Sequence, residues 1–164
     1  MSLEAAISYA RKKRKGPIIR GELTEEIKKW ITELGQEYKP AALPSDVSRG
    51  DVGECFDVAF INVFFSTKYQ YVEGMAFSGT EWVYHAWLTD GIHAYDPTWA
   101  VIGGMGMEDP KNPLRYIGIP LPAGFVSFFT QKTGYSGVLG NRARYPTAVD
   151  KILEYRKKEL EASK

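Results

Sequence analysis

The sequence predicts an α+β domain in which an antiparallel sheet packs on a helix, with further helices toward both ends of the chain. Segments rich in β-branched and aromatic residues, separated by turn residues, recur between positions 69 and 130. A helical period of apolar residues precedes them, at Phe56, Ala59, Phe60, Val63 and Phe64. Helical patterns also occupy residues 24–34 and 147–162.

Length and composition favour one domain over residues 1–164, with a core from about residue 50 to 130. The chain has 164 residues, of which 44% are hydrophobic, and a net charge of +1, which favours neither nucleic acid nor a membrane surface as a partner. Met1 to Arg20 lacks the apolar stretch of a signal peptide, and a single cysteine suits a reducing compartment. We therefore expect a cytoplasmic protein.

The elements before residue 55 are predicted as helices and a loop. Residues 2–13 form a short helix, followed by a basic run at 11–15 that we interpret as solvated charge. A stronger helix occupies residues 24–34, with Thr24 as its N-cap and Gly35 as its C-cap. Residues 39–50 form a surface loop that leads to the only cysteine.

The second half of the chain supplies the sheet. Residues 69–77, 81–89 and 92–96 form a three-stranded meander, and both of its faces are apolar enough to be covered. Residues 115–120 and 125–130 are two further strands, and residues 147–162 a closing helix. We expect Glu73 to face solvent, since unpaired carboxylates are rarely buried. Gly103 to Pro113 is either a lid or an ordinary connection.

The hairpin around Asp90-Gly91 brings together a histidine and an aspartate. A two-residue turn there pairs Thr89 with Ile92, which places His85 directly opposite Asp96. A carboxylate at that position can hold an imidazole in one tautomer and orientation, as a catalytic base requires. The same register turns His93 to the opposite face.

Cys55 is the candidate nucleophile. Two glycines, Gly50 and Gly53, precede it, and the apolar helix begins at Phe56. Free N–H groups and the dipole of a helix N-terminus stabilise a thiolate and can hold an oxyanion. Cys55 with His85 and Asp96 thus forms a set of nucleophile, base and orienting group.

These motifs resemble the transglutaminase-like branch of the papain-type cysteine proteases. The similar segments are Gly53-x-Cys55-x-x-x-Ala59, His85-Ala86-Trp87 and Tyr95-Asp96-Pro97-Thr98-Trp99. The resemblance implies a papain/transglutaminase-like core whose sheet packs on the cysteine helix. It also implies that Cys55 is the nucleophile, His85 the base and acid, and Asp96 the orienting residue. An oxyanion-hole side chain upstream of the cysteine has three candidates: Gln36, Trp30 and Tyr38.

This set of residues predicts a thiol-dependent acyl-transfer enzyme that needs no cofactor and no metal. We expect hydrolysis of a peptide or related amide bond, with a peptide or protein as substrate and with Trp87, Trp99 and Tyr71 as substrate-binding residues. Amine transfer of the transglutaminase type is an alternative. A second alternative is a non-catalytic binding or scaffold protein that uses the same aromatic cleft. Metal binding by the cysteine, the histidines and the aspartate is disfavoured because His93 points away.

Overall fold

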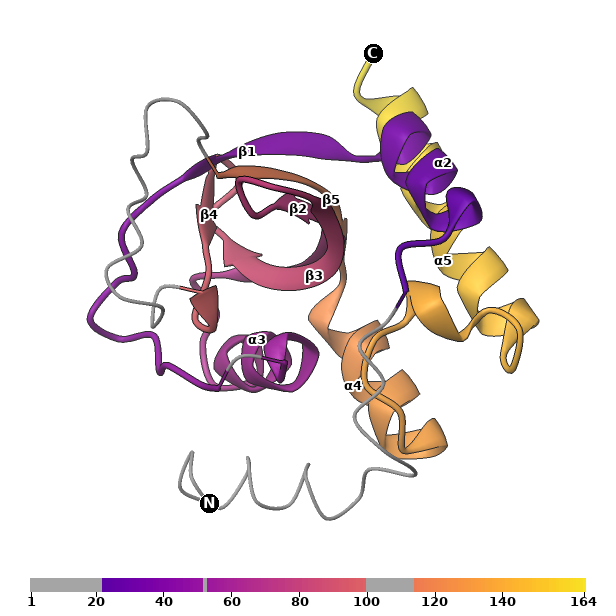
Figure 1. The fold of residues 1–164 in the computed structure, drawn as a ribbon. Helices are drawn as coiled ribbons and strands as arrows, with labels where there is room; N and C mark the ends of the chain where they lie inside the picture. Colours follow the sequence, from indigo (N-terminus) through magenta and orange to yellow (C-terminus); the bar gives the residue numbers. More distant parts are fainter. Residues whose placement is uncertain (1–21, 52, 100–113) are drawn as a thin grey trace.

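The computed structural model describes residues 22–51, 53–99 and 114–164, and its centre is a closed β-barrel (Figure 1). The barrel order is β1-β4-β3-β2-β5. The strands are β1 (Gln36–Pro40), β2 (Gln70–Phe77), β3 (Trp82–Thr89), β4 (His93–Tyr95) and β5 (Arg115–Leu121). β1 runs parallel to β4, and every other neighbouring pair is antiparallel. The predicted helix at 2–13, the basic run at 11–15 and the loop at 103–113 lie outside the described residues.

Helices cover the outside of the barrel. They are α2 (Glu25–Leu34), α3 (Cys55–Phe64), α4 (Ala123–Thr133), the 3₁₀ helix η2 (Leu139–Asn141) and α5 (Pro146–Ala162). α3 packs on β3 and β2, with α4 beside it, whereas α2 and α5 lie together on another side of the barrel (Figure 1). Within the described ranges, none of these helices is both long and apolar enough to cross a membrane.

The predicted papain/transglutaminase-like fold class is wrong, because the sheet closes on itself. The strand that closes it is β1, which joins β4 to β5 and which the sequence presents as a helix cap followed by a loop. β1 is short and polar, with Tyr38 as its one fully buried residue, so it carries too few apolar residues to be recognised as a strand. The sequence also predicts that both faces of the sheet are covered. In the structure the inner face is covered because the sheet rolls up into a barrel.

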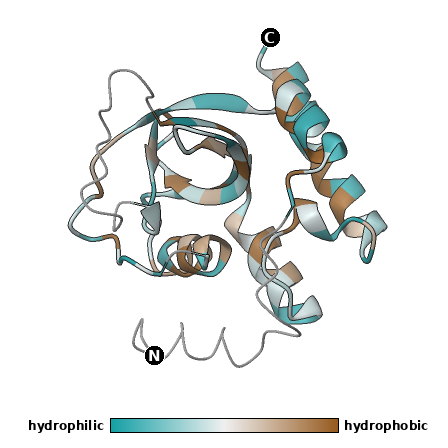
Figure 2. Cartoon of the chain, viewed as in Figure 1, coloured by the Kyte–Doolittle hydropathy of each residue, from teal (hydrophilic) through white to brown (hydrophobic). Residues whose placement is uncertain are grey.

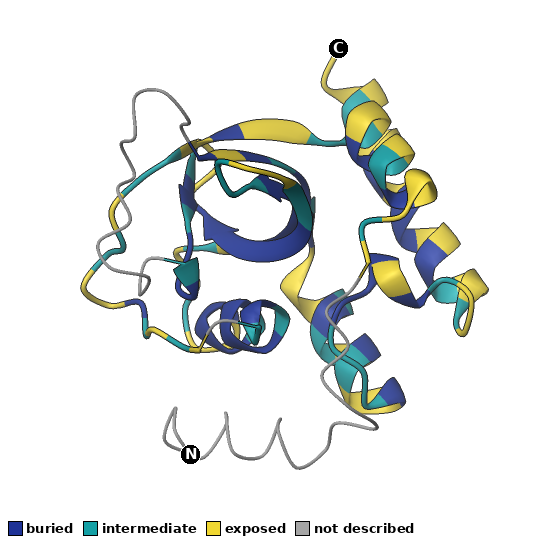
Figure 3. Cartoon of the chain, viewed as in Figure 1, coloured by how far each residue is buried: buried dark blue, intermediate teal, exposed yellow. Residues whose placement is uncertain are grey.

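Two apolar clusters follow from this closure. The inner cluster comes from all five strands and the residue before β5: Tyr38, Val72, Ala76, Trp87, Ala94, Leu114 and Tyr116. The outer cluster joins alternate strand residues, such as Tyr84, Ala86 and Leu88 of β3, to the helices. Figure 2 shows that α3 is rich in apolar residues, and Figure 3 shows that most residues of α3 and β3 are buried. The central strands β2 and β3 thus bury residues on both of their faces, whereas β1 buries only Tyr38 fully.

Two local predictions also fail. Residues 125–130 belong to α4 rather than to a strand, since Val126, Phe129 and Thr133 repeat at helical spacing and are the buried positions of that helix. Glu73 is completely buried rather than solvent-facing, and four hydrogen bonds satisfy its carboxylate. The aromatic content of residues 125–130 led to the prediction of a strand. The burial of Glu73 depends on hydrogen-bond partners that lie far along the chain.

The barrel interior is tightest where Gly74 of β2 faces Gly118 of β5, beneath the indole of Trp87. A methyl group built on Gly118 would lie 2.6 Å from Val72 Cγ1 and 2.8 Å from Trp87 Cη2. We therefore expect Gly118→Ala to lower the free energy of unfolding by about 3 kcal/mol, as overpacking of a dense core does. Urea denaturation measures this change.

Gly124 provides the matched control for that substitution. It lies in the first turn of α4, and a methyl group built there meets no atom within 4 Å. Gly124→Ala should leave stability unchanged or raise it by up to about 1 kcal/mol, because alanine favours the helix. Equal effects of the two substitutions would contradict the packing of Trp87 described here.

Candidate active site

Cys55 is the first residue of α3, as the sequence predicts. Gly53 adopts a positive φ of 94°, which lets the chain turn just before the helix. The preceding loop is fixed at two points: Gly50 N donates to Pro97 O over 3.1 Å, and Asn62 accepts from Ser48 N over 2.8 Å. The start of α3 is therefore held against the segment that follows β4.

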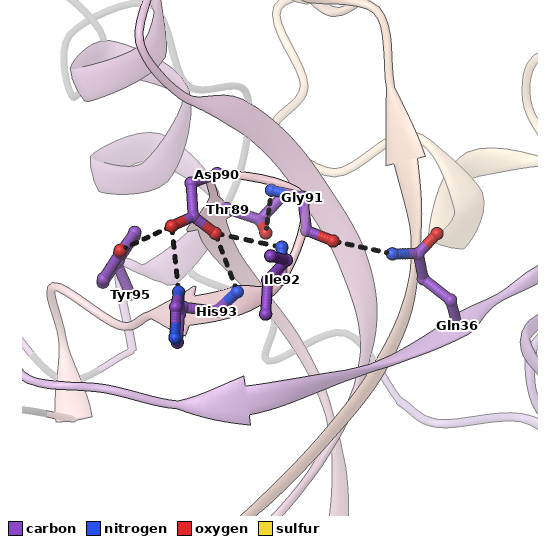
Figure 4. Close-up of polar contacts among 7 residues, drawn as sticks. All are labelled: Gln36, Thr89, Asp90, Gly91, Ile92, His93 and Tyr95. Atoms are coloured by element: carbon purple, nitrogen blue, oxygen red, sulfur yellow. Dashed lines mark hydrogen bonds and ion pairs between the residues drawn. The ribbon is translucent and has the colours of Figure 1, made fainter.

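The hairpin register differs from the predicted one by two residues, because Thr89 pairs with Ala94 rather than with Ile92. The cause is Asp90, whose Oδ1 accepts from the backbone nitrogens of Ile92 and His93 at 2.9 and 2.8 Å (Figure 4). These bonds widen the turn and leave Ile92 outside the β3–β4 ladder, where its carbonyl accepts from Lys39 N over 2.9 Å. A shift of two residues keeps every side chain on its predicted face, since side chains alternate with period two.

His85 and Asp96 meet despite the changed register. Their side chains are joined by a contact of 2.7 Å between Nε2 and Oδ2. Within the described residues β4 pairs with β3 only at Leu88 and Thr89, so the side of β3 next to His85 is not covered by a strand. The segment after β4 folds into this opening and places Asp96 beside the imidazole. Cys55 lies near enough to the same imidazole to raise the pKa of His85, which completes a Cys–His–Asp arrangement.

Five donors surround the carboxylate of Asp96. Oδ2 accepts from His85 and from the Tyr116 hydroxyl, the latter at 2.8 Å. Oδ1 accepts from the backbone nitrogen and the hydroxyl of Thr98 and from the backbone nitrogen of Trp99, each at 3.1 Å. The segment 96–99 therefore wraps its own carboxylate, while β5 holds the oxygen that faces His85.

Electrostatics favour a charged His85 and an ionised Asp96. Burial disfavours the charged imidazole, but the negative charges of Asp96 and Cys55 and their hydrogen bonds raise the pKa of His85 to about 10. Burial also opposes ionisation of Asp96, yet the charge of His85 and hydrogen bonds, including that from Tyr116, lower the pKa of that carboxyl. The pair is thus suited to carry an imidazolium beside a carboxylate.

Trp99 covers the imidazole. The two rings stack with centroids 4.3 Å apart and an interplanar angle of 29°. Cys55, His85 and Asp96 keep only 6%, 3% and 5% of their surface exposed, whereas Trp99 is half-buried. Of these four residues, Trp99 therefore has the largest exposed fraction.

The other predicted substrate-binding residues lie inside the protein. Trp87 has no exposed surface and belongs to the inner cluster of the barrel. Tyr71 is equally buried and donates its hydroxyl to Glu73 Oε1 over 2.7 Å. Of the three predicted substrate-binding residues, only Trp99 therefore has exposed surface in this structure.

The three oxyanion-hole candidates are separated by the fold. Gln36 is exposed and donates to Gly91 O over 3.2 Å, at the turn between β3 and β4 (Figure 4). Trp30 lines a groove between α2 and α5. Tyr38 alone enters the barrel, beside Trp87. The contacts of Gln36 and Trp30 are thus with other parts of the protein than the cysteine. The first turn of α3 places backbone N–H groups beside Cys55, and such groups can hold an oxyanion.

Two functional neighbours are not recognisable in the sequence. Tyr116 reaches Asp96 across the barrel, which requires closure of a sheet that the sequence does not predict. Glu73 lies on the outer face near Tyr84, a residue whose pKa is raised by burial, by Glu73 and also by the charge of Cys55. The alternation of strand residues, once the strands were placed correctly, would have put Tyr116 on the inner face.

His93 lies outside this cluster. Its Nδ1 contacts Asp90 Oδ2 at 2.9 Å in the exposed turn, and Tyr95 donates to the same oxygen (Figure 4). Across ranges 22–51, 53–99 and 114–164, no three histidine, cysteine, aspartate or glutamate side chains are grouped so that they could hold a metal ion.

Comparison of the chain with models of protein families, with curated proteins and with solved structures gives no match. Function can therefore be inferred only from the geometry of Cys55, His85 and Asp96 and from the residues around them.

Proposed function

We propose that the chain is a thiol-dependent acyl-transfer enzyme that hydrolyses a peptide or related amide bond. The observation that carries this proposal is the cluster of Cys55, His85 and Asp96, in which Nε2 of the imidazole contacts Asp96 Oδ2 at 2.7 Å and Cys55 lies near enough to raise the pKa of His85. The order of these residues along the chain, which resembles that of transglutaminase-like enzymes, also supports it.

The reaction follows from the positions of these groups. His85 takes the proton of the Cys55 thiol, and the thiolate attacks the carbonyl carbon to form a carbon–sulfur bond. Backbone N–H groups at the start of α3 stabilise the oxyanion. The imidazolium then donates its proton to the departing amine as the carbon–nitrogen bond breaks. Water, deprotonated by His85, attacks the thioester, and the carboxylic acid and the free thiol are released.

Alkylation of Cys55 tests the first step of this mechanism without a known substrate. Cys55 is the only cysteine, so every alkylation event occurs there. We expect the folded protein to react with iodoacetamide at pH 6 more than ten times faster than His85→Ala, because a free thiol with a pKa of about 8.5 is mostly protonated at that pH. The rate is measured by mass spectrometry of the intact protein.

His93→Ala is the matched control, since it removes the chain's other histidine at an exposed turn. It should react like the unchanged protein. Equal and slow rates for the unchanged protein and His85→Ala would overturn the proposal and favour a non-catalytic binding protein.

Acyl transfer itself can be tested with p-nitrophenyl acetate. The thiolate of Cys55 should release one equivalent of p-nitrophenolate in a burst and become acetylated, and Cys55→Ala should give no burst. Hydrolysis predicts that acetate is then the product even when a primary amine such as glycine methyl ester is added. An amide of the added amine as main product would instead favour the transglutaminase type of transfer.

A further inference from the structure

Among the described hydrogen-bond partners of Asp96, Tyr116 is the only one that comes from β5, on the opposite side of the barrel from His85 on β3. Its hydroxyl donates over 2.8 Å to Oδ2, the same oxygen that faces His85 Nε2. The side chain keeps 2% of its surface exposed and packs edge-on against Trp87, with ring centroids 5.1 Å apart. The hydroxyl thus has little freedom to leave Asp96.

The remaining donors to Asp96 cannot replace it. Thr98 and Trp99 bond Oδ1 and belong to the same short segment as Asp96, so they move together with the carboxylate. Tyr116 comes from β5, which is paired with β1 on one side and β2 on the other. It is therefore the contact that fixes Oδ2 relative to the barrel, and so relative to His85 on β3.

We propose that Tyr116 is a positioning residue of the active site, which holds Asp96 Oδ2 against His85 and keeps the carboxylate ionised at acidic pH. This inference rests on the proposed function, since it assigns a fourth member to the same site. Tyr116 acts through Asp96 and does not touch the substrate or the reacting sulfur.

The chemistry of the hydrogen bond gives the direction of the effect. The titratable groups around Asp96 are His85 from β3, Tyr116 from β5 and, through His85, Cys55 from α3. Burial and the charge of Asp96 raise the pKa of Tyr116 well above its usual 10, so its hydroxyl keeps the proton that it donates. Loss of this donor makes Asp96 easier to protonate, and a neutral Asp96 no longer stabilises the imidazolium.

The test is the pH profile of Cys55 alkylation in Tyr116→Phe. The rate falls at low pH when the thiolate–imidazolium pair is lost, and we expect the midpoint of this fall to move upward by about one pH unit. Above pH 9, where any cysteine is largely ionised, the two proteins should react alike. In an Asp96→Asn background, Tyr116→Phe should have no further effect on the profile, because the ionisable carboxylate that Tyr116 stabilises is no longer present.

Val72→Ala is the matched control. Val72 belongs to the same inner cluster of the barrel as Tyr116 and has no exposed surface, but its side chain carries no polar atom that could bond Asp96. It should leave the profile unchanged. A general loosening of the barrel, in contrast, would shift the profile in both variants and would overturn the assignment.

The outcomes separate this inference from the proposed function. If Cys55 of the unchanged protein reacts like a free thiol, the proposed function is refuted. If Cys55 is activated but the pH profiles of the unchanged protein and of Tyr116→Phe are identical, only the role of Tyr116 is refuted. If Tyr116→Phe does not fold, the ¹³Cζ resonance of Tyr116 in the unchanged protein decides. It should titrate with the acidic midpoint of alkylation, and a resonance that is independent of pH would overturn the role.

Discussion

Glu73→Ala should lower the free energy of unfolding by at least about 4 kcal/mol, because it leaves four buried donors without an acceptor. Each carboxylate oxygen accepts from one tyrosine hydroxyl and one backbone nitrogen: Oε1 from Tyr71 and Val138, Oε2 from Tyr84 and Leu139. Burial raises the pKa of Glu73, which reflects the cost of desolvating the carboxylate, while the four hydrogen bonds lower it. Urea denaturation of the variant measures the loss.

Glu73→Gln sharpens this prediction. The amide nitrogen of glutamine must face either Val138 N or Leu139 N, and a backbone N–H cannot turn to accept, whereas a tyrosine hydroxyl can. One buried N–H therefore stays unpaired in either orientation, at a cost of about 2 kcal/mol. Glu81→Gln, on an exposed residue just before β3, should change stability by less than about 0.5 kcal/mol. A similarly small effect of Glu73→Gln would contradict the proposed network.

Stability should also fall at alkaline pH because of His85. The pKa of His85 rises from 6.5 in the unfolded chain to about 10 in the folded protein, so the folded state holds this proton more tightly. The resulting stabilisation is complete below pH 6.5 and is lost as the pH rises toward 10. The slope reaches at most about 1.4 kcal/mol per pH unit. Asp96 acts in the opposite direction: its lowered pKa gives stability that is lost as the pH falls below about 3.8.

His85→Gln isolates the contribution of His85 together with the groups coupled to it, Asp96 and Cys55, since groups that do not interact with His85 titrate alike in both proteins. The difference in free energy of unfolding between the two should shrink steadily between pH 6.5 and 10. His93→Gln, at the exposed turn, should keep the slope of the unchanged protein. A difference that stays constant with pH would show that His85 does not hold a proton through its contacts with Asp96 and Cys55.

The sequence predicts those parts of the site that depend on local pattern. The start of α3 at Cys55 follows from two glycines and an apolar helical period, and β2 and β3 lie within a residue of their predicted bounds. The contact between His85 and Asp96 is predicted as well, although for a register that is wrong by two residues. Alternation explains this success, because a shift of two preserves the face on which each side chain lies.

Long-range pairing is the part that a single sequence does not reveal. The polar segment of β1 becomes a strand only because β4 and β5 offer it backbone partners on both sides. Tyr116 and Glu73 likewise gain their roles from partners on other strands or on the turn near residue 138. Local propensity carries no information about such partners, so the sequence does not reveal the barrel or the hydrogen bonds of Tyr116 and Glu73.

Closure by β1 has a consequence for how the protein folds. On folding, Lys39 pairs with His93 and Gln36 pairs with Gly118. The seams that β1 forms with β4 and β5 therefore join residues that are distant along the chain. Pairings of this kind form slowly, because the entropy of closing the intervening loop is lost before any contact repays it. In the chain, Cys55, His85 and Asp96 all lie between β1 and β5, which form one of these seams. The appearance of a reactive thiol during refolding would therefore mark the moment at which the barrel closes.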